Sequence, residues 1–143
     1  MSQSLAKIYT HIIFSTKHRE NILHPTIQPE LYRYIGGICN NLECYPVKIG
    51  GFTDHVHILC MLSKKITLMD LLKEIKQSSS IWIKTKGDGF NNFYWQDGYG
   101  AFSVNPSEIE MVSDYIMKQE EHHKKKTFQE EYRVEYDERY VWD

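Results

Sequence analysis

The chain has 143 residues, of which 41% are hydrophobic, 25% charged and 13% aromatic, and its formal net charge is −2. This size and composition are ordinary for a folded protein with a single domain, here spanning residues 1–143. The mildly acidic total excludes a general polycation, so binding to nucleic acid would have to use local basic patches.

Membrane insertion and a metal site built on cysteine are both disfavoured by the sequence. No apolar run approaches the ~20 residues of a membrane span, and residues 1–7 lack the apolar core of a signal peptide. We therefore expect a cytoplasmic protein. The three cysteines, Cys39, Cys44 and Cys60, lack the CxxC spacing of metal sites. Cys39 and Cys60 fall in apolar predicted elements and are expected to be core residues rather than reactive thiols.

The first half of the chain predicts a strand, a helix and a β-hairpin. Residues 7–15 alternate and are rich in β-branched and aromatic side chains, as in a strand. Pro29 suits the first turn of a helix. The apolar residues of that helix recur at helical spacing, at Leu31, Ile35, Ile38 and Leu42. Residues 45–52 and 55–62 predict two further strands, which a short turn would join as an antiparallel pair.

The middle of the chain predicts a second long helix followed by short strands. Thr67 suits the N-cap of a helix that continues toward Trp82. Residues 87–89, Gly-Asp-Gly, would end it. Residues 93–96 and 101–104 are aromatic and strand-like.

A last helix is predicted to begin at Asn105 and to run through Gln119. Asn105 suits the N-cap, Pro106 the first helical position and Glu108 the N3 position of a capping box. Its apolar stripe, which would dock on the sheet, is Ile109, Val112 and Ile116. The polar segment from Thr127 onward is expected to be helical and partly exposed.

The order of these elements predicts an α+β fold, a ferredoxin-like or RRM-like antiparallel sheet with helices on one face and an additional C-terminal helix. Because alternate strand residues share a face, four residues would face the helices: Val56, Ile58, Cys60 and Leu62. The opposite face, with His55 and His57, would need another cover, such as the last helix, a ligand or a second subunit.

Two histidines flank one apolar residue in the stretch Asp54-His55-Val56-His57. In a strand their imidazoles lie on one face, with Cα atoms roughly 6–7 Å apart. Two convergent imidazoles on a rigid strand can form half of a divalent-metal site. The pattern by itself favours the simpler interpretation of two polar positions that face solvent or a partner.

Tyr115 and Gln119 are four residues apart on the last predicted helix, so they lie on one flank, one turn apart. His122 falls near the same flank. The apolar stripe lies beside it, which places Tyr115 and Gln119 at the border of a buried face. Taken alone, they would be a semi-buried tyrosine and a surface glutamine.

Several motifs, in the correct order, resemble the single-tyrosine HUH transposases of bacterial and archaeal insertion sequences, in which U is a hydrophobic residue. This group includes the IS200-like enzymes and their REP-associated relatives. The resembling segments are YTHIIFSTKHR (9–19), DHVHIL (54–59), Lys76 with Ser78 and Ser79, YWQDGYGAFSV (94–104) and YIMKQEEHH (115–123). The HUH motif alone would also fit replication initiators and relaxases.

The resemblance implies an enzyme that cuts single-stranded DNA at the ends of a mobile element and rejoins it. Tyr115 would be the nucleophile, giving a 5′-phosphotyrosine. His55, His57 and Gln119 would hold a divalent metal, Mg²⁺ or Mn²⁺ by family, although imidazole ligands also permit Zn²⁺ or Ni²⁺. His122 could replace or join Gln119. The resemblance further implies DNA with a hairpin at the element ends, and a homodimer in which one subunit's tyrosine helix can complete the other's site.

Lys17, Arg19 and Lys76 are the candidate phosphate contacts. The aromatic residues between 93 and 102 could stack on unpaired bases or pack as a β-hairpin. Asp54 could orient a histidine or close a turn. Two alternative functions stay open: a domesticated single-strand endonuclease that processes hairpin repeats, and a non-catalytic nucleic-acid-binding module on an RRM-like sheet.

Overall fold

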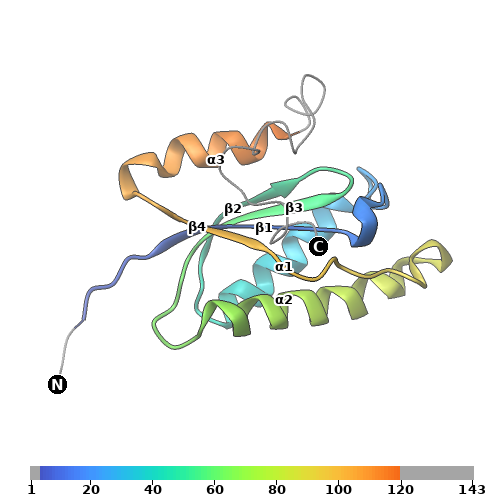
Figure 1. Cartoon of the computed structure of the whole chain (residues 1–143), viewed down its shortest axis with the longest axis horizontal. Helices are drawn as coiled ribbons and strands as arrows, with labels where there is room; N and C mark the ends of the chain where they lie inside the picture. The colour runs from blue at the N-terminus through green and yellow to red at the C-terminus, as the bar shows by residue number, and fades with distance from the viewer. Residues whose placement is uncertain (1–3, 120–143) are drawn as a thin grey trace.

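The computed structural model describes residues 4–119 and contains one four-stranded antiparallel sheet with helices on both faces (Figure 1). The sheet order is β2-β3-β1-β4. Two helices lie below the sheet in Figure 1 and the third lies above it. In chain order the elements are β1 (Tyr9–Ser15), α1 (Gln28–Asn41), β2 (Pro46–Gly51), β3 (His55–Met61), α2 (Leu68–Ile83), β4 (Gly100–Val104) and α3 (Ile109–Met117). The α+β prediction, with a separate C-terminal helix, is confirmed.

The two central strands, β1 and β3, divide their side chains between two functions. Because successive residues point to opposite faces, one set enters the hydrophobic core beneath α1 and α2: Ile12, Phe14, Val56, Ile58 and Cys60. The other set, which includes His55 and His57, faces α3. Antiparallel pairing places Ile13 opposite His57 and Ser15 opposite His55. The sheet therefore separates the core that stabilises the fold from the face that carries the histidines.

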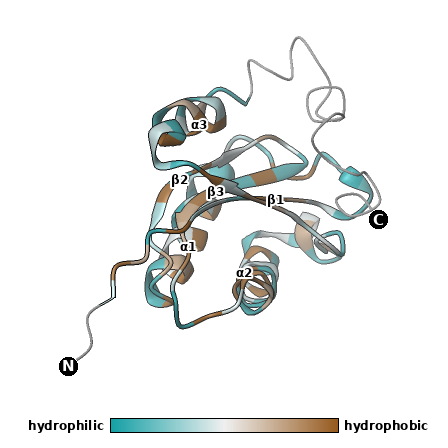
Figure 2. Cartoon of the chain, turned by 60° about the vertical axis from the view of Figure 1, so that its left-hand side comes forward, coloured by the Kyte–Doolittle hydropathy of each residue, from teal (hydrophilic) through white to brown (hydrophobic). Residues whose placement is uncertain are grey.

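The main hydrophobic core lies between the sheet and the two helices α1 and α2. Leu31 and Ile35 of α1, and Leu71 and Ile75 of α2, are fully buried against the sheet. Figure 2 shows these two hydrophobic helices on one side and α3 on the other. Each buried Leu or Ile contributes about 1.5–3 kcal/mol relative to exposure. The cysteines are buried and free, as expected of core residues, and burial raises the pKa of the Cys39 thiol to about 12.

Residues 93–96 do not form the predicted strand. Their only ladder contact in the described structure is a single bridge between Thr16 and Trp95. The rings of Phe93 and Trp95 are buried in the core instead, and the Trp95 indole N–H donates to Ser79 Oγ at 2.9 Å. The aromatic composition that suggested a strand therefore serves to anchor a loop against α2.

Of the two predicted N-caps, Thr67 caps the predicted helix and Asn105 caps a shorter element. Thr67 Oγ1 accepts from the Asp70 N–H at 3.1 Å, which confirms this N-cap. Asn105 Oδ1 accepts from the Ser107 N–H at 3.0 Å, but it caps a 3₁₀ turn, and α3 begins only at Ile109.

The last helix is shorter than predicted. It ends at Met117, because Lys118 leaves the helical region at φ −98° and ψ 21°. Gln119 lies beyond this break, where the backbone is helical again, and is not part of α3 itself. His122 and the helix predicted from Thr127 lie outside the described residues. No helix within 4–119 has the length and apolar character needed to cross a bilayer.

Candidate metal and nucleophile site

His55 and His57 lie side by side on the α3 face of the sheet, as alternation along β3 predicts. Both are 0% exposed, and their ring centroids are 5.0 Å apart. They are therefore buried under α3 rather than facing open solvent. This excludes the simpler interpretation of two solvent-facing polar positions.

His55 is held between a carboxylate and an amide. Its Nδ1 lies 2.7 Å from Asp54 Oδ1, and its Nε2 lies 3.1 Å from Gln119 Oε1. A carboxylate only accepts hydrogen bonds, so Nδ1 carries the proton and donates to Asp54. In a neutral imidazole, Nε2 then presents a lone pair toward Gln119. Asp54 is thereby the group that orients His55 and does more than close the turn.

The Gln119 amide also presents a lone pair toward His55. Its Nε2 donates to the Tyr115 carbonyl at 3.2 Å, and this bond fixes which end of the amide is oxygen. Two facing acceptors at 3.1 Å are stabilised by a positive charge between them, either a proton or a cation. Adjacent ligands of an octahedral ion with bonds of about 2.1 Å are separated by about 3 Å. The pair therefore fits two neighbouring ligands of Mg²⁺ or Mn²⁺.

His57 contacts a histidine to which the sequence gave no role. His11 Nε2 lies 2.8 Å from His57 Nδ1, and the two rings stack with centroids 5.0 Å apart. Burial lowers the pKa of His11 to about 4, so this imidazole is neutral at pH 7. A neutral His11 can accept the Nδ1–H of His57, and in that tautomer of His57 the lone pair is on Nε2.

His11 could have been identified only from the register between β1 and β3. The sequence alone does not show that His11 shares a face with His55 and His57. In the structure His11 pairs with Leu59, which places it diagonal to His57 on that face. Ser15 was missed for the same reason. It pairs with His55, and its buried hydroxyl has no hydrogen-bond partner within residues 4–119.

α3 brings Tyr115 to the histidines by packing on a glycine. Gly50 of β2 pairs with His57, and a Cβ at Gly50 would lie 2.9 Å from the Ile116 carbonyl oxygen and from Ile116 Cγ2. This close approach sets the edge of the His57 ring against the Tyr115 ring, with centroids 5.9 Å apart. Gln119 is 1% exposed, so it is a buried residue of the site rather than a surface glutamine.

The basic residues Lys17 and Arg19 lie in a strained turn that follows β1. His18 and Arg19 have φ values of 58° and 52°, a left-handed conformation that costs side-chain-bearing residues about 1–2 kcal/mol each. Such strain is found where the surrounding structure fixes a functional segment. The turn is bonded directly to the site, because the Thr16 N–H donates to the Asp54 carbonyl at 2.9 Å.

Lys76 lies on the other side of the sheet. Its ammonium donates to the carbonyls of Gln96 at 2.8 Å and Gly98 at 2.6 Å, and it stands 5.6 Å from the Phe14 ring centroid. Burial lowers its pKa to about 8, against the opposing effect of Asp97. Two of its three N–H donors thus hold the loop, and one is left for another contact.

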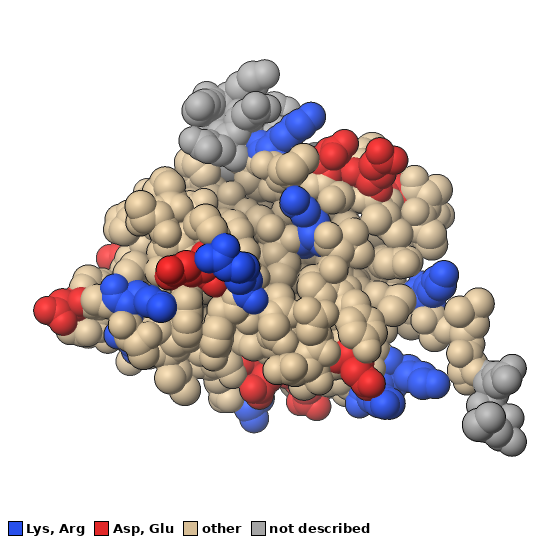
Figure 3. Space-filling model, turned by 180° about the vertical axis from the view of Figure 1, so that it is seen from behind, with Lys and Arg blue, Asp and Glu red and all other residues tan. Residues whose placement is uncertain are grey.

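The charge on the outer surface is mixed. In Figure 3, basic and acidic side chains are interspersed, and acidic side chains gather at the start of α3, where Glu108 and Glu110 are exposed. Within residues 4–119 there is no group of three or more His, Cys, Asp or Glu side chains that could hold a metal. The candidate ligand set described here, two imidazoles and an amide, contains only two residues of those types.

Comparisons with known proteins agree with this geometry. Residues 4–119 match the family model of IS200-like transposases. A candidate transposase from Deinococcus radiodurans R1 superposes with a TM-score of 0.65 at 20% identity, over 83% of this chain and 98% of that one. A REP-associated tyrosine transposase bound to a REP hairpin gives a TM-score of 0.63 at 18% identity, over 86% of this chain and 74% of that one. No curated protein matches by sequence.

An antiparallel α+β sheet with paired histidines on one face and a tyrosine-bearing helix above them is the arrangement that the resemblance to HUH transposases predicts. The family match covers every described residue from Ser4 to Gln119. The chain belongs to the IS200-like transposase family.

Proposed function

We propose that this protein cleaves and rejoins single-stranded DNA at the ends of an insertion sequence, with Tyr115 as nucleophile and a divalent metal as cofactor. The proposal depends on one observation: the Tyr115 ring lies against His57, and Gln119 lies against His55. These contacts form although His57 and Tyr115 are 58 positions apart in the sequence. Family membership supports the DNA-transposing activity.

His55 Nε2, His57 Nε2 and Gln119 Oε1 would hold the metal. A bound Mg²⁺ or Mn²⁺ would neutralise charge on the scissile phosphate and orient it for attack. Asp54 and His11 each take the Nδ1–H of one histidine, so both rings keep the tautomer that ligates through Nε2. The buried hydroxyl of Ser15 is available to a phosphate oxygen beside His55.

Tyr115 would supply the covalent step. Its phenol oxygen forms a bond to phosphorus, and the bond from phosphorus to the 3′ oxygen breaks, which leaves a 5′-phosphotyrosine and a free 3′-OH. The phenol proton goes to the departing oxygen directly or through water. A phenol with a pKa of ~10 is a weak nucleophile at neutral pH, so activation at the site is required. The reverse step rejoins DNA without ATP, because the ester bond is conserved.

Lys17 and Arg19 would bind phosphates of the DNA as it approaches the site. The structural relative bound to a REP hairpin supports a hairpin-bearing strand as the substrate. We also propose a homodimer, in which α3 completes either the site of its own subunit or that of its partner. His122, which lies outside the described residues, is a candidate for an additional ligand.

The proposal is tested by trapping the covalent intermediate. Wild-type protein and a Tyr115→Phe variant are incubated with labelled single-stranded DNA from the flanks of the gene and Mn²⁺ or Mg²⁺, then separated on a denaturing gel. A shifted band that requires both Tyr115 and metal is expected. Cleavage without that band would indicate hydrolysis by a nuclease, and DNA binding without cleavage would favour a non-catalytic module.

A further inference from the structure

Tyr94 is presented outward between two lysines. Its side chain is 58% exposed, whereas the rings of Phe93 and Trp95 on either side are buried. Lys84 Nζ, at the end of α2, lies 4.6 Å from the Tyr94 ring centroid, and Lys17 Nζ lies 5.7 Å from it. The backbone N–H of Lys17 also donates to the Tyr94 carbonyl at 2.9 Å, so the Tyr94 segment is bonded directly to the turn that carries Lys17.

The positive charge around Tyr94 is not neutralised within the described part of the chain. Neither Lys17 nor Lys84 forms a salt bridge to a carboxylate there. Besides its contact with the Tyr94 ring, the Lys84 ammonium donates a hydrogen bond to the Ser80 hydroxyl at 3.3 Å. Beside the ring is a hollow of about 490 Å³, lined by Lys76, Gln77, Ser80, Ile81, Tyr94 and Gln96. Asp97, at its edge, is the one acidic group in the lining.

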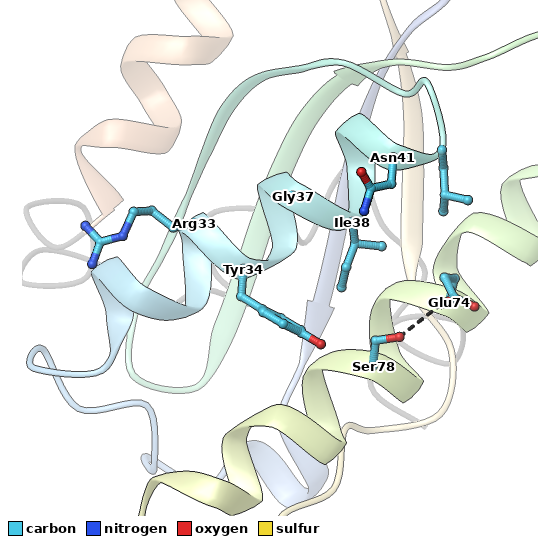
Figure 4. Close-up of a pocket in the computed structure, with 8 residues that line it drawn as sticks. Arg33, Tyr34, Gly37, Ile38, Asn41, Glu74 and Ser78 are labelled. Carbon is cyan, nitrogen blue, oxygen red and sulfur yellow. Dashed lines mark hydrogen bonds between the residues drawn. The ribbon is translucent and has the colours of Figure 1, made fainter.

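A second aromatic and basic cluster, between α1 and α2, lacks these properties. Trp82 is covered by Tyr34, whose ring stacks on it at 5.0 Å, and its neighbour Lys86 pairs with Glu30 at 3.8 Å. Figure 4 shows the adjoining groove, in which Ser78 bonds Glu74 and the Arg33 side chain points away. In this cluster a second ring covers Trp82 and a carboxylate pairs with Lys86, whereas Lys17 and Lys84 have no carboxylate partner within residues 4–119.

Tyr94 is close enough to the histidines for one DNA strand to reach both. The backbone of His55 pairs with Ser15, and the next residue, Thr16, pairs with Trp95. Two strand spacings of about 4.8 Å therefore separate the two segments, about 10 Å in all. Stacked nucleotides rise 3.4 Å per step, so this backbone interval alone corresponds to about three nucleotides, and a strand that joins the Tyr94 ring to the histidines needs at least that many. The strand would pass around the end of β1, where Lys17 and Arg19 lie.

We propose that Tyr94, Lys17 and Lys84 form a subsite for one unpaired nucleobase and its phosphate, about three or more nucleotides from the bond that is cut. The inference rests on the proposed function, because the strand that fills the subsite is the one cleaved at Tyr115. The Tyr94 ring stacks on the base, and the two ammonium groups bind the flanking phosphates. Stacking tolerates any base, so the subsite holds the strand without reading its sequence.

The first test measures binding of a hairpin oligonucleotide with a short single-stranded extension by fluorescence anisotropy. Tyr94→Ala is expected to weaken binding about 5- to 150-fold, the range for loss of one aromatic stacking partner. Tyr94→Phe, which keeps the π face, should stay within about threefold of wild type. Tyr45→Ala is the matched control, because Tyr45 is 50% exposed at the opposite end of the sheet, and it should bind as wild type.

The second test locates the base. Single 2-aminopurine substitutions are scanned along the extension, and quenching is expected at one position about three or more nucleotides from the cleaved bond. This quenching should be lost in Tyr94→Ala. Lys17→Gln and Lys84→Gln should each reduce the slope of log K against log salt by about 0.7. Wild-type affinity and unchanged quenching in Tyr94→Ala would overturn the subsite.

The covalent-adduct gel separates this inference from the proposed function. If wild type forms the adduct and Tyr94→Ala binds equally well, only the subsite is rejected. If binding depends on Tyr94 but no adduct forms, the subsite stands and the transesterase chemistry is rejected. If wild type binds no single-stranded DNA, both are overturned.

Discussion

Gly50→Ala should displace the nucleophile while leaving the sheet intact. The added Cβ would lie 2.9 Å from the Ile116 carbonyl oxygen, which is backbone and cannot rotate away. Ordinary contact requires about 3.5 Å, so α3 must move outward by about 0.6 Å or more. Overpacking of this kind typically costs about 1–3 kcal/mol. Because α1 and α2 pack on the other face, the main core is not disturbed.

The displacement acts on Tyr115, the residue before Ile116. Catalytic groups must be held to within about 0.5 Å, and a misplacement of about 1 Å can lower a rate about 100-fold. We therefore expect adduct formation by Gly50→Ala to be about 10- to 100-fold slower than wild type in single-turnover gels. The circular dichroism spectrum and hairpin affinity should be retained.

Gly37→Ala is the matched control, because a Cβ there meets no atom within 4 Å. In the middle of α1 this change should stabilise the protein by up to about 1 kcal/mol and leave the adduct rate unaltered. A Gly50→Ala protein with wild-type rate and wild-type melting temperature would refute the argument that this glycine sets the position of α3.

Two further predictions concern His11 and Lys76. His11→Leu should weaken Mn²⁺ binding about 10- to 100-fold in calorimetry. His11→Gln, which keeps an acceptor oxygen, should recover most of that affinity. Equal affinities in wild type and both variants would show that His11 does not orient His57. Burial lowers the pKa of Lys76 from 10.5 to about 8, so between these values the unfolded chain binds more protons than the folded protein, and stability rises with pH. In urea titrations wild type should therefore gain stability relative to Lys76→Met between pH 8 and 10.5, and a constant difference would contradict this.

The fold and the central part of the site could be predicted because they depend on local periodicity. Alternation along residues 55–61 places His55 and His57 on one face whatever lies around them. The capping residues Thr67 and Asn105 likewise act on groups two or three residues away. The proximity of Tyr115 to His57 was expected from the family resemblance and not from spacing.

The features that escaped prediction depend on contacts distant in the sequence. His11 acquires a role only through the β1–β3 register, which brings it to His57 across 46 residues. The aromatic run at 93–96 has the composition of a strand, but burial of the Trp95 ring against Ser79 outweighs ladder pairing. No local signal marks the break at Lys118 that ends α3 at Met117, because lysine is compatible with a helix. Gln119, beyond the break, is helical again and contacts His55.

Strict division of β1 and β3 into two faces makes this protein unusually sensitive to insertions. One extra residue in β3 beyond His57 would shift Ile58, Leu59 and Cys60 to the opposite faces, and one before His55 would turn both histidines into the apolar layer beneath α1. The same error would bury polar side chains in the apolar layer and expose core side chains on the face that α3 covers. Length variation among relatives should therefore fall in the connections between elements and spare these two strands, in which folding and chemistry impose one shared register.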